Sequence, residues 1–226
     1  IDAGRFAPAR TKTKSRTPVV GVSGFVYPGG RKGEHLVKQL AQSGVGRQLT
    51  LKAAGRGWAV PTTYYEQKDL PAFYQSLDVY LCTATIEGVP MPPLEALACG
   101  VKIVIPRAVG LLDDLPDLPG IVRYTAGDYA DMERAISEAV ASEADPAALR
   151  AAVETRYTGE AWADDHVRAF ERLLNPPVVE SLPDWRGNAG VYYVAFGAPA
   201  RQCAAAAVES WHKHMGDVPC AVASES

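Results

Sequence analysis

Residues 78–105 read DVYLCTATIEGVPMPPLEALACGVKIVI. The two ends of this stretch, at 78–83 and 101–105, predict buried strands, because strands favour β-branched and aromatic residues. The prolines and the Leu-Glu-Ala-Leu run between them predict a short helix over 92–99, and Gly100 stands where a glycine commonly ends a helix. A strand, a helix and a second strand in this order are typical of a parallel α/β sheet.

The same alternation continues on both sides of this stretch. The further strands that we expect cover 19–23, 48–54 and 120–124. The further helices cover 36–41, 70–77 with Asp69 as its N-cap, and a region from Asp128 to about Leu174 with breaks at Asp145-Pro146 and Thr158-Gly159. We therefore expect an α/β fold, a Rossmann-like parallel sheet flanked by helices, whose ligands bind beyond the carboxyl ends of the strands.

The end of the chain reads as a separate element. Residues 176–189 are rich in proline and predict a linker, and residues 190–226 predict a partial β-α-β unit with strands at 191–196 and 218–223 and a helix at 199–214. This unit either adds edge strands to the main sheet or begins a second α/β domain that the chain truncates. We favour the second interpretation, because the linker is too polar for the interior of a domain.

Composition excludes several classes of protein. Of the 226 residues 47% are hydrophobic and 22% charged, which is ordinary for a globular protein, and a net charge of −3 argues against a general nucleic-acid binder. No apolar run approaches the roughly 20 residues that span a bilayer. Four cysteines without CxxC spacing indicate neither a zinc site nor a disulfide scaffold, so we expect a cytoplasmic protein. Five basic residues and no acid between 5 and 16 are interpreted as a solvated linker rather than a phosphate- or membrane-seeking arm.

Two carboxylates in the central stretch, Glu87 and Glu95, stand eight positions apart, one in a loop and one in the first turn of the helix. The free amides of that turn, Leu94 among them, together with the positive end of the helix dipole, form a seat for a phosphate. A carboxylate accepts two hydrogen bonds side by side, which suits the vicinal hydroxyls of a ribose or a hexose. The spacing thus predicts one ligand with a phosphate on the helix end and a sugar on either side. The alternative is that Glu95 only interacts favourably with the helix dipole and that Glu87 faces solvent.

The block 87–100 resembles the Glu-x7-Glu signature of retaining GT-B glycosyltransferases of group 1, a family 4-like group. Further likenesses to that family lie at Asp2–Pro8, which is similar to its segment between the lobes, at Val19–Gly33 (first strand and phosphate loop), at Leu51–Gly57 and at Leu70–Asp78. The resemblance covers about residues 2–174 and implies one lobe of a GT-B fold, the C-terminal, donor-binding one. It implies an interlobe linker at 1–18 and a donor-binding lobe at 19–175.

The resemblance also implies roles for individual residues. Glu87 contacts the donor sugar near the reacting carbon, Lys32 neutralises the departing diphosphate, and Glu95 holds the ribose. The remaining residues expected to bind the donor are Gly24, Arg31, Gly88, Val89, Pro90, Met91 and Leu94. We expect no metal and no other cofactor, because lysine and amides neutralise the charge. One position departs from the family: Phe25 stands where an arginine is usual, so either Arg31 replaces it or the phosphate clamp is weaker.

The function that the resemblance implies is transfer of a hexose, with retention of configuration, from a nucleoside diphosphate sugar to an acceptor that is a glycan, lipid or protein. The resemblance implies an N-terminal acceptor lobe that residues 1–226 do not supply, and we expect it in the same or another chain. A noncatalytic nucleotide-sugar binding or scaffold module is the alternative. A sugar-nucleotide epimerase of the same architecture ranks last, since it should lack the full block. Residues from Gly190 faintly resemble the opening of a GT-A transferase.

Overall fold

The computed structural model describes residues 1–9, 16–174, 191–195 and 220–224. The chain forms two compact units, Ile1–Phe170 and Glu171–Ser226. The expected linker 176–189 and the expected helix 199–214 lie outside the described residues. The domain boundaries read from the sequence stay predictions.

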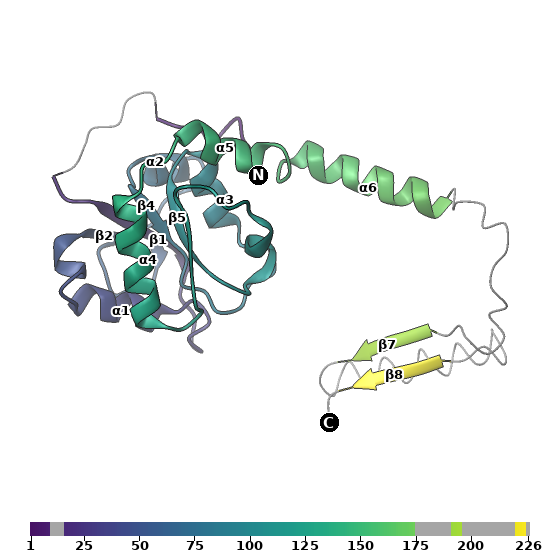
Figure 1. Cartoon of the computed structure of the whole chain (residues 1–226), viewed down its shortest axis with the longest axis horizontal. Helices are drawn as coiled ribbons and strands as arrows, with labels where there is room; N and C mark the ends of the chain where they lie inside the picture. Colours follow the sequence, from purple (N-terminus) through teal and green to yellow (C-terminus); the bar gives the residue numbers. More distant parts are fainter. Residues whose placement is uncertain (10–15, 175–190, 196–219, 225–226) are drawn as a thin grey trace. The chain divides into compact units, whose positions relative to one another are not determined.

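The first unit contains a six-stranded sheet in the order β3-β2-β1-β4-β5-β6, with every neighbouring pair parallel (Figure 1). Its strands are β1 (Val19–Phe25), β2 (Thr50–Arg56), β3 (Thr62–Thr63), β4 (Val79–Leu81), β5 (Lys102–Pro106) and β6 (Ile121–Tyr124). The expected parallel, Rossmann-like sheet flanked by helices is confirmed.

Helices cover both faces of this sheet and bury a separate apolar cluster on each. One face packs against α1 (Glu34–Gln42) and α4 (Tyr129–Ala141), through residues such as Leu40 and Ile136. The other face packs against α2 (Leu70–Gln75), α3 (Met91–Ala98) and α5 (Pro146–Glu154), through residues such as Phe73 and Leu97. Burial on both sides explains why Ile103, Val104 and Ile105 of β5 are apolar in succession rather than alternating with polar residues.

The expected breaks in the last helical region are confirmed. The Asp128 side chain accepts a hydrogen bond from the Asp131 amide at 3.0 Å and caps α4, and Asp145 caps α5 through the Ala147 amide at 2.9 Å. Pro146 then occupies the first turn of α5, where a missing N–H costs nothing. Helix α6 covers Gly159–Leu174.

Two expectations about the first half of the chain are wrong in detail. Residues 46–48 form a short 3-10 helix, η1 (Gly46–Gln48), so the next strand begins at Thr50 rather than at 48. Asp69 lies at the N-cap of α2, as expected, but it has helical φ and ψ angles, and its side chain makes no capping hydrogen bond because such a cap requires an extended backbone. Helix α2 ends at Gln75 rather than at 77, although Leu77 remains fully buried behind it.

Residues ahead of β1 pack on the first unit. Phe6 is buried, and the Arg150 guanidinium of α5 donates hydrogen bonds to the carbonyl oxygens of Ala3 and Phe6, both at 2.6 Å. In the second unit, β7 (Val191–Ala195) and β8 (Cys220–Ser224) form a parallel two-stranded sheet of their own. Across the described ranges, none of the helices combines the length and the apolar character that a bilayer crossing needs.

The strand order fixes where a ligand can bind. Strand β1 pairs with β2 on one side and with β4 on the other, so the connection leaves β1 in one direction and returns past it. At such a reversal the loops that follow the two central strands diverge and open a crevice at their carboxyl ends. The loop after β1 carries the Gly-rich stretch up to Gly33, and the loop after β4 carries Glu87.

Candidate functional site

Two adjoining pockets lie at the carboxyl ends of the strands. The first, which we name the lysine pocket, has a volume of about 220 Å³ and is lined by Lys32, Glu87, Trp58, Val89, Pro90 and Met91 among others. The second, the aromatic pocket, has a volume of about 350 Å³ and is lined by Gly24, Phe25, Tyr64, Tyr74 and Glu95 among others. Ser23, Met91 and Pro92 line both, so the two pockets are neighbours along one crevice.

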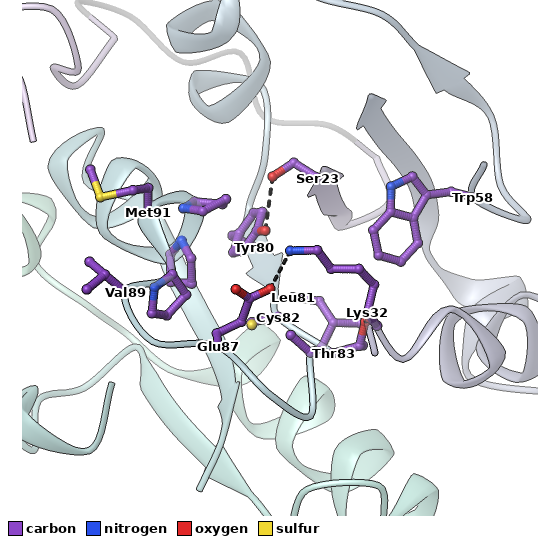
Figure 2. A pocket seen from close by; sticks show the side chains of 14 residues that line it. Ser23, Lys32, Trp58, Tyr80, Leu81, Cys82, Thr83, Glu87, Val89 and Met91 are labelled. Atoms are coloured by element: carbon purple, nitrogen blue, oxygen red, sulfur yellow. Dashed lines mark hydrogen bonds and ion pairs between the residues drawn. The ribbon is translucent and has the colours of Figure 1, made fainter. Parts of the chain in front are cut away.

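Lys32 and Glu87 meet across the lysine pocket. The Lys32 Nζ donates a hydrogen bond to Glu87 Oε1, and the side chains keep 23% and 18% of their surface accessible, so water and small ligands reach both. Figure 2 shows the two side chains facing one another, with Trp58 beyond Lys32 and with Val89 and Met91 on the side of Glu87. The predicted catalytic pair is therefore together, and each member neutralises the other.

The loop that carries Lys32 is tied to the end of β4. Thr83 Oγ1 donates to the Lys32 carbonyl oxygen at 2.6 Å, and the Thr85 amide donates to the Arg31 carbonyl oxygen at 3.0 Å. Gly33 has a φ of +65° and lies so close to the Thr83 carbonyl that a Cβ would overlap it. Only glycine fits this turn, which starts α1 and directs Lys32 into the pocket.

The loop that carries Glu87 is held from the opposite side by η2 (Gly110–Asp114). Gly110 has a φ of +56° and touches the backbone of Glu87 and Gly88, so that a Cβ there would overlap both carbonyl oxygens. The position of Glu87 thus depends on a backbone contact more than twenty residues further along the chain.

Helix α3 begins where the two pockets join. Pro90 is its N-cap residue, and Met91, Pro92 and Pro93 form its first turn. The two prolines lack N–H groups, so the Met91 amide is the main unpaired donor that this turn can offer to a ligand. Leu94 is buried in the core and lines neither pocket.

Glu95 projects from the next turn of α3 into the aromatic pocket. The Tyr74 hydroxyl of α2 donates to Glu95 Oε2 at 2.7 Å, and Ser23 of β1 connects the hydroxyls of Tyr74 and Tyr80. Burial raises the pKa of Glu95, an effect that the Tyr74 hydrogen bond and the positive charge of Arg5 partly offset. Glu95 and Glu87 therefore line neighbouring pockets in different environments.

Exposed aromatic rings border the aromatic pocket. Phe25, at the end of β1, and Tyr64, after β3, stack with their ring centroids 6.3 Å apart and their planes 26° apart. The Arg56 guanidinium lies over the Phe25 ring, 5.7 Å from its centroid, because Phe25 and Arg56 are partners in the β1–β2 register. Both rings keep a large exposed surface, 40% for Phe25 and 64% for Tyr64. Aromatic surface of this kind next to a carboxylate suits a ligand that joins a flat ring to a group with hydroxyls.

The structure brings most of the predicted residues together, but not all. Glu87, Lys32, Val89, Pro90 and Met91 line the lysine pocket, and Gly24, Met91 and Glu95 line the aromatic pocket. Arg31, Gly88 and Leu94 line neither. Among the described residues that line the two pockets, Lys32 is the only basic one, and the expected part of Arg31 in the phosphate clamp stays a prediction.

Sequence reasoning missed the residues that other elements contribute. Trp58 lines the lysine pocket, and its indole nitrogen donates to the Gly24 carbonyl oxygen at 2.9 Å. Ser23, Tyr64 and Tyr74 were not predicted to lie at the site either. Their positions follow from the pairing of β1, β2 and β4, and a motif search along the chain cannot supply that pairing.

Comparison with known families gives a match for the central part of the chain. Residues 59–156 match the family described as glycosyl transferases group 1. The central part of the chain is therefore similar to that family. The matched segment contains Glu87, Glu95, α3 and the Gly110 contact, whereas Lys32 and the β1 loop lie ahead of it.

Solved structures extend the likeness to most of the first unit. The sucrose-phosphate synthase of Thermosynechococcus elongatus is 20% identical, with a TM-score of 0.60 over 77% of this chain and 51% of that one. The C-terminal domain of a group 1 protein (LpcC) from Francisella tularensis is 14% identical, with a TM-score of 0.55 over 70% of this chain and 99% of the domain. Anabaena HepE, solved in complex with UDP-glucose, is 16% identical, with a TM-score of 0.58 over 69% of this chain and 49% of HepE. These likenesses establish the fold, that of one lobe of a GT-B protein.

The chain spans about half the length of several of the structures that it matches. A comparison with curated protein sequences gave no match.

Proposed function

We propose that this chain carries the donor-binding lobe of a retaining glycosyltransferase, which transfers a hexose from a nucleoside diphosphate sugar to an acceptor. The observation that carries the proposal is the placement of Lys32, Glu87 and Glu95 along two adjoining pockets that share Ser23, Met91 and Pro92. The match of residues 59–156 to the group 1 family supports it. The UDP-glucose bound by HepE is the kind of ligand that we expect here.

The two pockets divide the donor between them. We assign the sugar and the diphosphate to the lysine pocket, where Glu87 accepts hydrogen bonds from sugar hydroxyls and the amides near Val89 and Met91 face the phosphates. We assign the nucleoside to the aromatic pocket, where Glu95 accepts hydrogen bonds from two ribose hydroxyls and the rings of Phe25 and Tyr64 stack with the base. This division suits the chemistry of each lining, since diphosphates need positive charge and bases need flat apolar surface.

Lys32 is the group that we expect to lower the barrier. When the bond between the anomeric carbon and the phosphate oxygen breaks, negative charge grows on the leaving diphosphate, and a positioned ammonium stabilises it. Before the donor binds, Lys32 is paired with Glu87. When the donor binds, we expect Lys32 to pair with the diphosphate instead, which leaves Glu87 free to accept hydrogen bonds from the sugar hydroxyls. We expect no metal ion, because Lys32 and the helix amides supply the positive charge.

A noncatalytic donor-binding module is the second candidate, and one observation favours it. Lys32 is the only basic residue among the described linings of the two pockets, and Phe25 occupies the position of the usual arginine. A single cation binds a diphosphate, but it stabilises a leaving group less than two cations do.

Binding and turnover distinguish these functions. We expect one of UDP, GDP or ADP to raise the thermal midpoint of the chain, since ligand at about 100 times its dissociation constant adds roughly 2.7 kcal/mol of stability. Glu95→Ala should lose this shift, whereas Glu138→Ala, which removes an exposed carboxylate from α4, should keep it. If no nucleotide shifts the midpoint, or if Glu95→Ala leaves the shift unchanged, the proposal fails. Release of nucleotide from a sugar nucleotide in the presence of the acceptor lobe supports the enzyme, and tight binding without release supports the module.

A further inference from the structure

Three hydroxyls and one carboxylate form a connected chain that runs from the lysine pocket, which Tyr80 lines, to the aromatic pocket, which Tyr74 and Glu95 line. The Tyr80 hydroxyl lies 3.0 Å from Ser23 Oγ, Ser23 Oγ lies 3.4 Å from the Tyr74 hydroxyl, and Tyr74 donates to Glu95 Oε2 at 2.7 Å. Figure 2 shows the first of these links, between Ser23 and Tyr80. The groups come from four elements, β4, β1, α2 and α3, so the tertiary fold rather than a local motif assembles the chain.

The hydroxyl chain is buried and keeps its protons. Tyr74 and Tyr80 are 1% and 3% exposed, and Ser23 is 8% exposed. Burial raises the pKa of both tyrosines well above the usual value, so their hydroxyls remain donors at neutral pH. With every donor used once, Tyr80 donates to Ser23, Ser23 donates to Tyr74, and Tyr74 donates to the carboxylate. Hydrogen bonds in such a series strengthen one another.

The Tyr74 ring has little freedom to move. It packs edge-on against Phe6, Phe73 and Tyr80, with ring centroids 5.9, 5.4 and 5.7 Å away. A fixed ring holds its hydroxyl at one place, and the hydroxyl holds one oxygen of Glu95. Two further charged groups, Arg5 and the amino group of Ile1, act on Glu95, and both lower its pKa. The charge of Glu95 in turn raises the pKa of Cys99, which follows α3.

We propose that Tyr74 is a positioning residue for the donor: its hydroxyl, supported by Ser23 and Tyr80, orients Glu95 so that the carboxylate accepts the vicinal hydroxyls of a ribose. The inference rests on the proposed function, because it requires a nucleotide in the aromatic pocket. It adds to that function a reason why a partly buried carboxylate keeps one orientation without a cation bonded to it. Tyr74 itself does not touch the ligand through this hydroxyl, so it acts through Glu95.

The experiment compares each nucleotide with its 2′-deoxy form. Dissociation constants of UDP, GDP and ADP and of dUDP, dGDP and dADP are measured by calorimetry for the wild-type chain and for Tyr74→Phe. We expect the wild-type chain to prefer the ribonucleotide that it binds by about tenfold, the typical effect of one hydrogen bond to a charged group. In Tyr74→Phe this preference should fall below about threefold, because the Glu95 carboxylate no longer has one orientation in which it accepts a hydrogen bond from the 2′-hydroxyl. Ser23→Ala, which interrupts the chain one step earlier, should show an intermediate loss.

Matched variants separate positioning from structural damage. Tyr129→Phe removes another tyrosine hydroxyl that donates to a glutamate, Glu133, at 2.8 Å on α4, and it should keep the wild-type preference. General damage from Tyr74→Phe would weaken both nucleotides by one factor and leave their ratio unchanged, and that result overturns the inference while the proposed function stands. A wild-type chain that binds a nucleotide but ignores the 2′-hydroxyl overturns it as well. If the wild-type chain binds none of the six nucleotides, the proposed function fails first. If Tyr74→Phe does not fold, Ser23→Ala decides the question by the same ratio.

Discussion

The two carboxylates of the central block, Glu87 and Glu95, are held in opposite ways. Glu87 belongs to an open loop, and its partner is the ammonium of Lys32, which a more negative ligand can draw away. Glu95 belongs to a helix, and its partner is the hydroxyl of a buried tyrosine, which remains in place when a ligand arrives. The difference indicates that one end of the crevice rearranges its charges on binding, whereas the other end is prepared in advance.

The largest loss of affinity should come from a change in the lysine pocket, where Lys32 exchanges Glu87 for the ligand. Lys32→Met keeps the side-chain stem and removes the charge, and we expect nucleoside diphosphate affinity to fall about 100-fold, because a hydrogen bond to a charged group contributes roughly 1.5–3 kcal/mol. Calorimetry measures the loss, and Lys38→Met, an exposed lysine on α1, is the control. A loss of less than about threefold would remove Lys32 from the binding site.

The backbone contact that supports the Glu87 loop should matter next. Gly110→Ala places a Cβ on the carbonyl oxygens of Glu87 and Gly88 at a φ of +56°, so the free energy of unfolding should fall by about 2 kcal/mol. Gly127→Ala is the matched control, because it has a φ of +79° but nothing within 4 Å of the added atom, and it should cost about 1 kcal/mol. Urea unfolding measures both. Equal losses would mean that Gly110 acts only through its own backbone angles.

A smaller effect should follow from the aromatic pocket. Tyr64→Ala removes the ring that stacks on Phe25, and nucleotide affinity should fall about fivefold, since stacking of a base on an aromatic ring contributes on the order of 1 kcal/mol. Tyr27→Ala is the control, because Tyr27 is 62% exposed and lines neither pocket. A nucleotide that binds Tyr64→Ala as tightly as the wild-type chain would place the base elsewhere.

The smallest effect concerns the pH dependence of stability. Burial raises the folded-state pKa of Glu95 above its ordinary 4.5, so its contribution to stability is present below about pH 4.5 and is lost as the pH rises through the raised value. Asp131 has the opposite sign: hydrogen bonds from the Thr125 amide and Arg134 lower its pKa from 3.8 to about 2, so its contribution is present above pH 3.8 and is lost as the pH falls to about 2.

Urea unfolding between pH 2 and pH 7 tests both signs. Glu95→Gln should flatten the decline of stability above pH 4.5, and Asp131→Asn should flatten the decline at low pH. If Glu95→Gln instead lowers stability increasingly as the pH rises, burial does not dominate the ionisation of Glu95.

Much of the fold could be predicted from the sequence, because it depends on local signals. The buried run at β5, the prolines before α3 and the aspartate caps of α4 and α5 each specify an element from its own residues. The errors occurred where a neighbour decides the outcome. Asp69 lies at the N-cap of α2, but its helical backbone angles, which the preceding turn sets, leave its side chain without a capping hydrogen bond.

The residues of the site also fall into those that local sequence predicts and those that only the tertiary fold brings there. Glu87, Glu95 and Lys32 could be named in advance because they belong to recognisable stretches, and the structure brings them to one crevice. Ser23, Tyr64 and Tyr74 could not, since each reaches the aromatic pocket only through the parallel pairing of β1, β2 and β4 and the packing of α2 against α3. Leu94 illustrates the converse, because its place in the motif says nothing of its burial in the core.

The most direct test of the division between the lysine pocket and the aromatic pocket measures the affinities of four ligands: UDP, UDP-glucose, GDP and GDP-mannose. Each is measured for the wild-type chain, for Glu87→Gln and for Glu95→Gln. For the base that binds, we predict that Glu95→Gln weakens the nucleotide and its sugar conjugate by the same factor, about tenfold. Glu87→Gln should remove only the additional affinity that the sugar provides, and it should bind the plain nucleotide as well as or better than the wild-type chain, because Lys32 is released. Equal losses for both ligands in both variants would contradict the account.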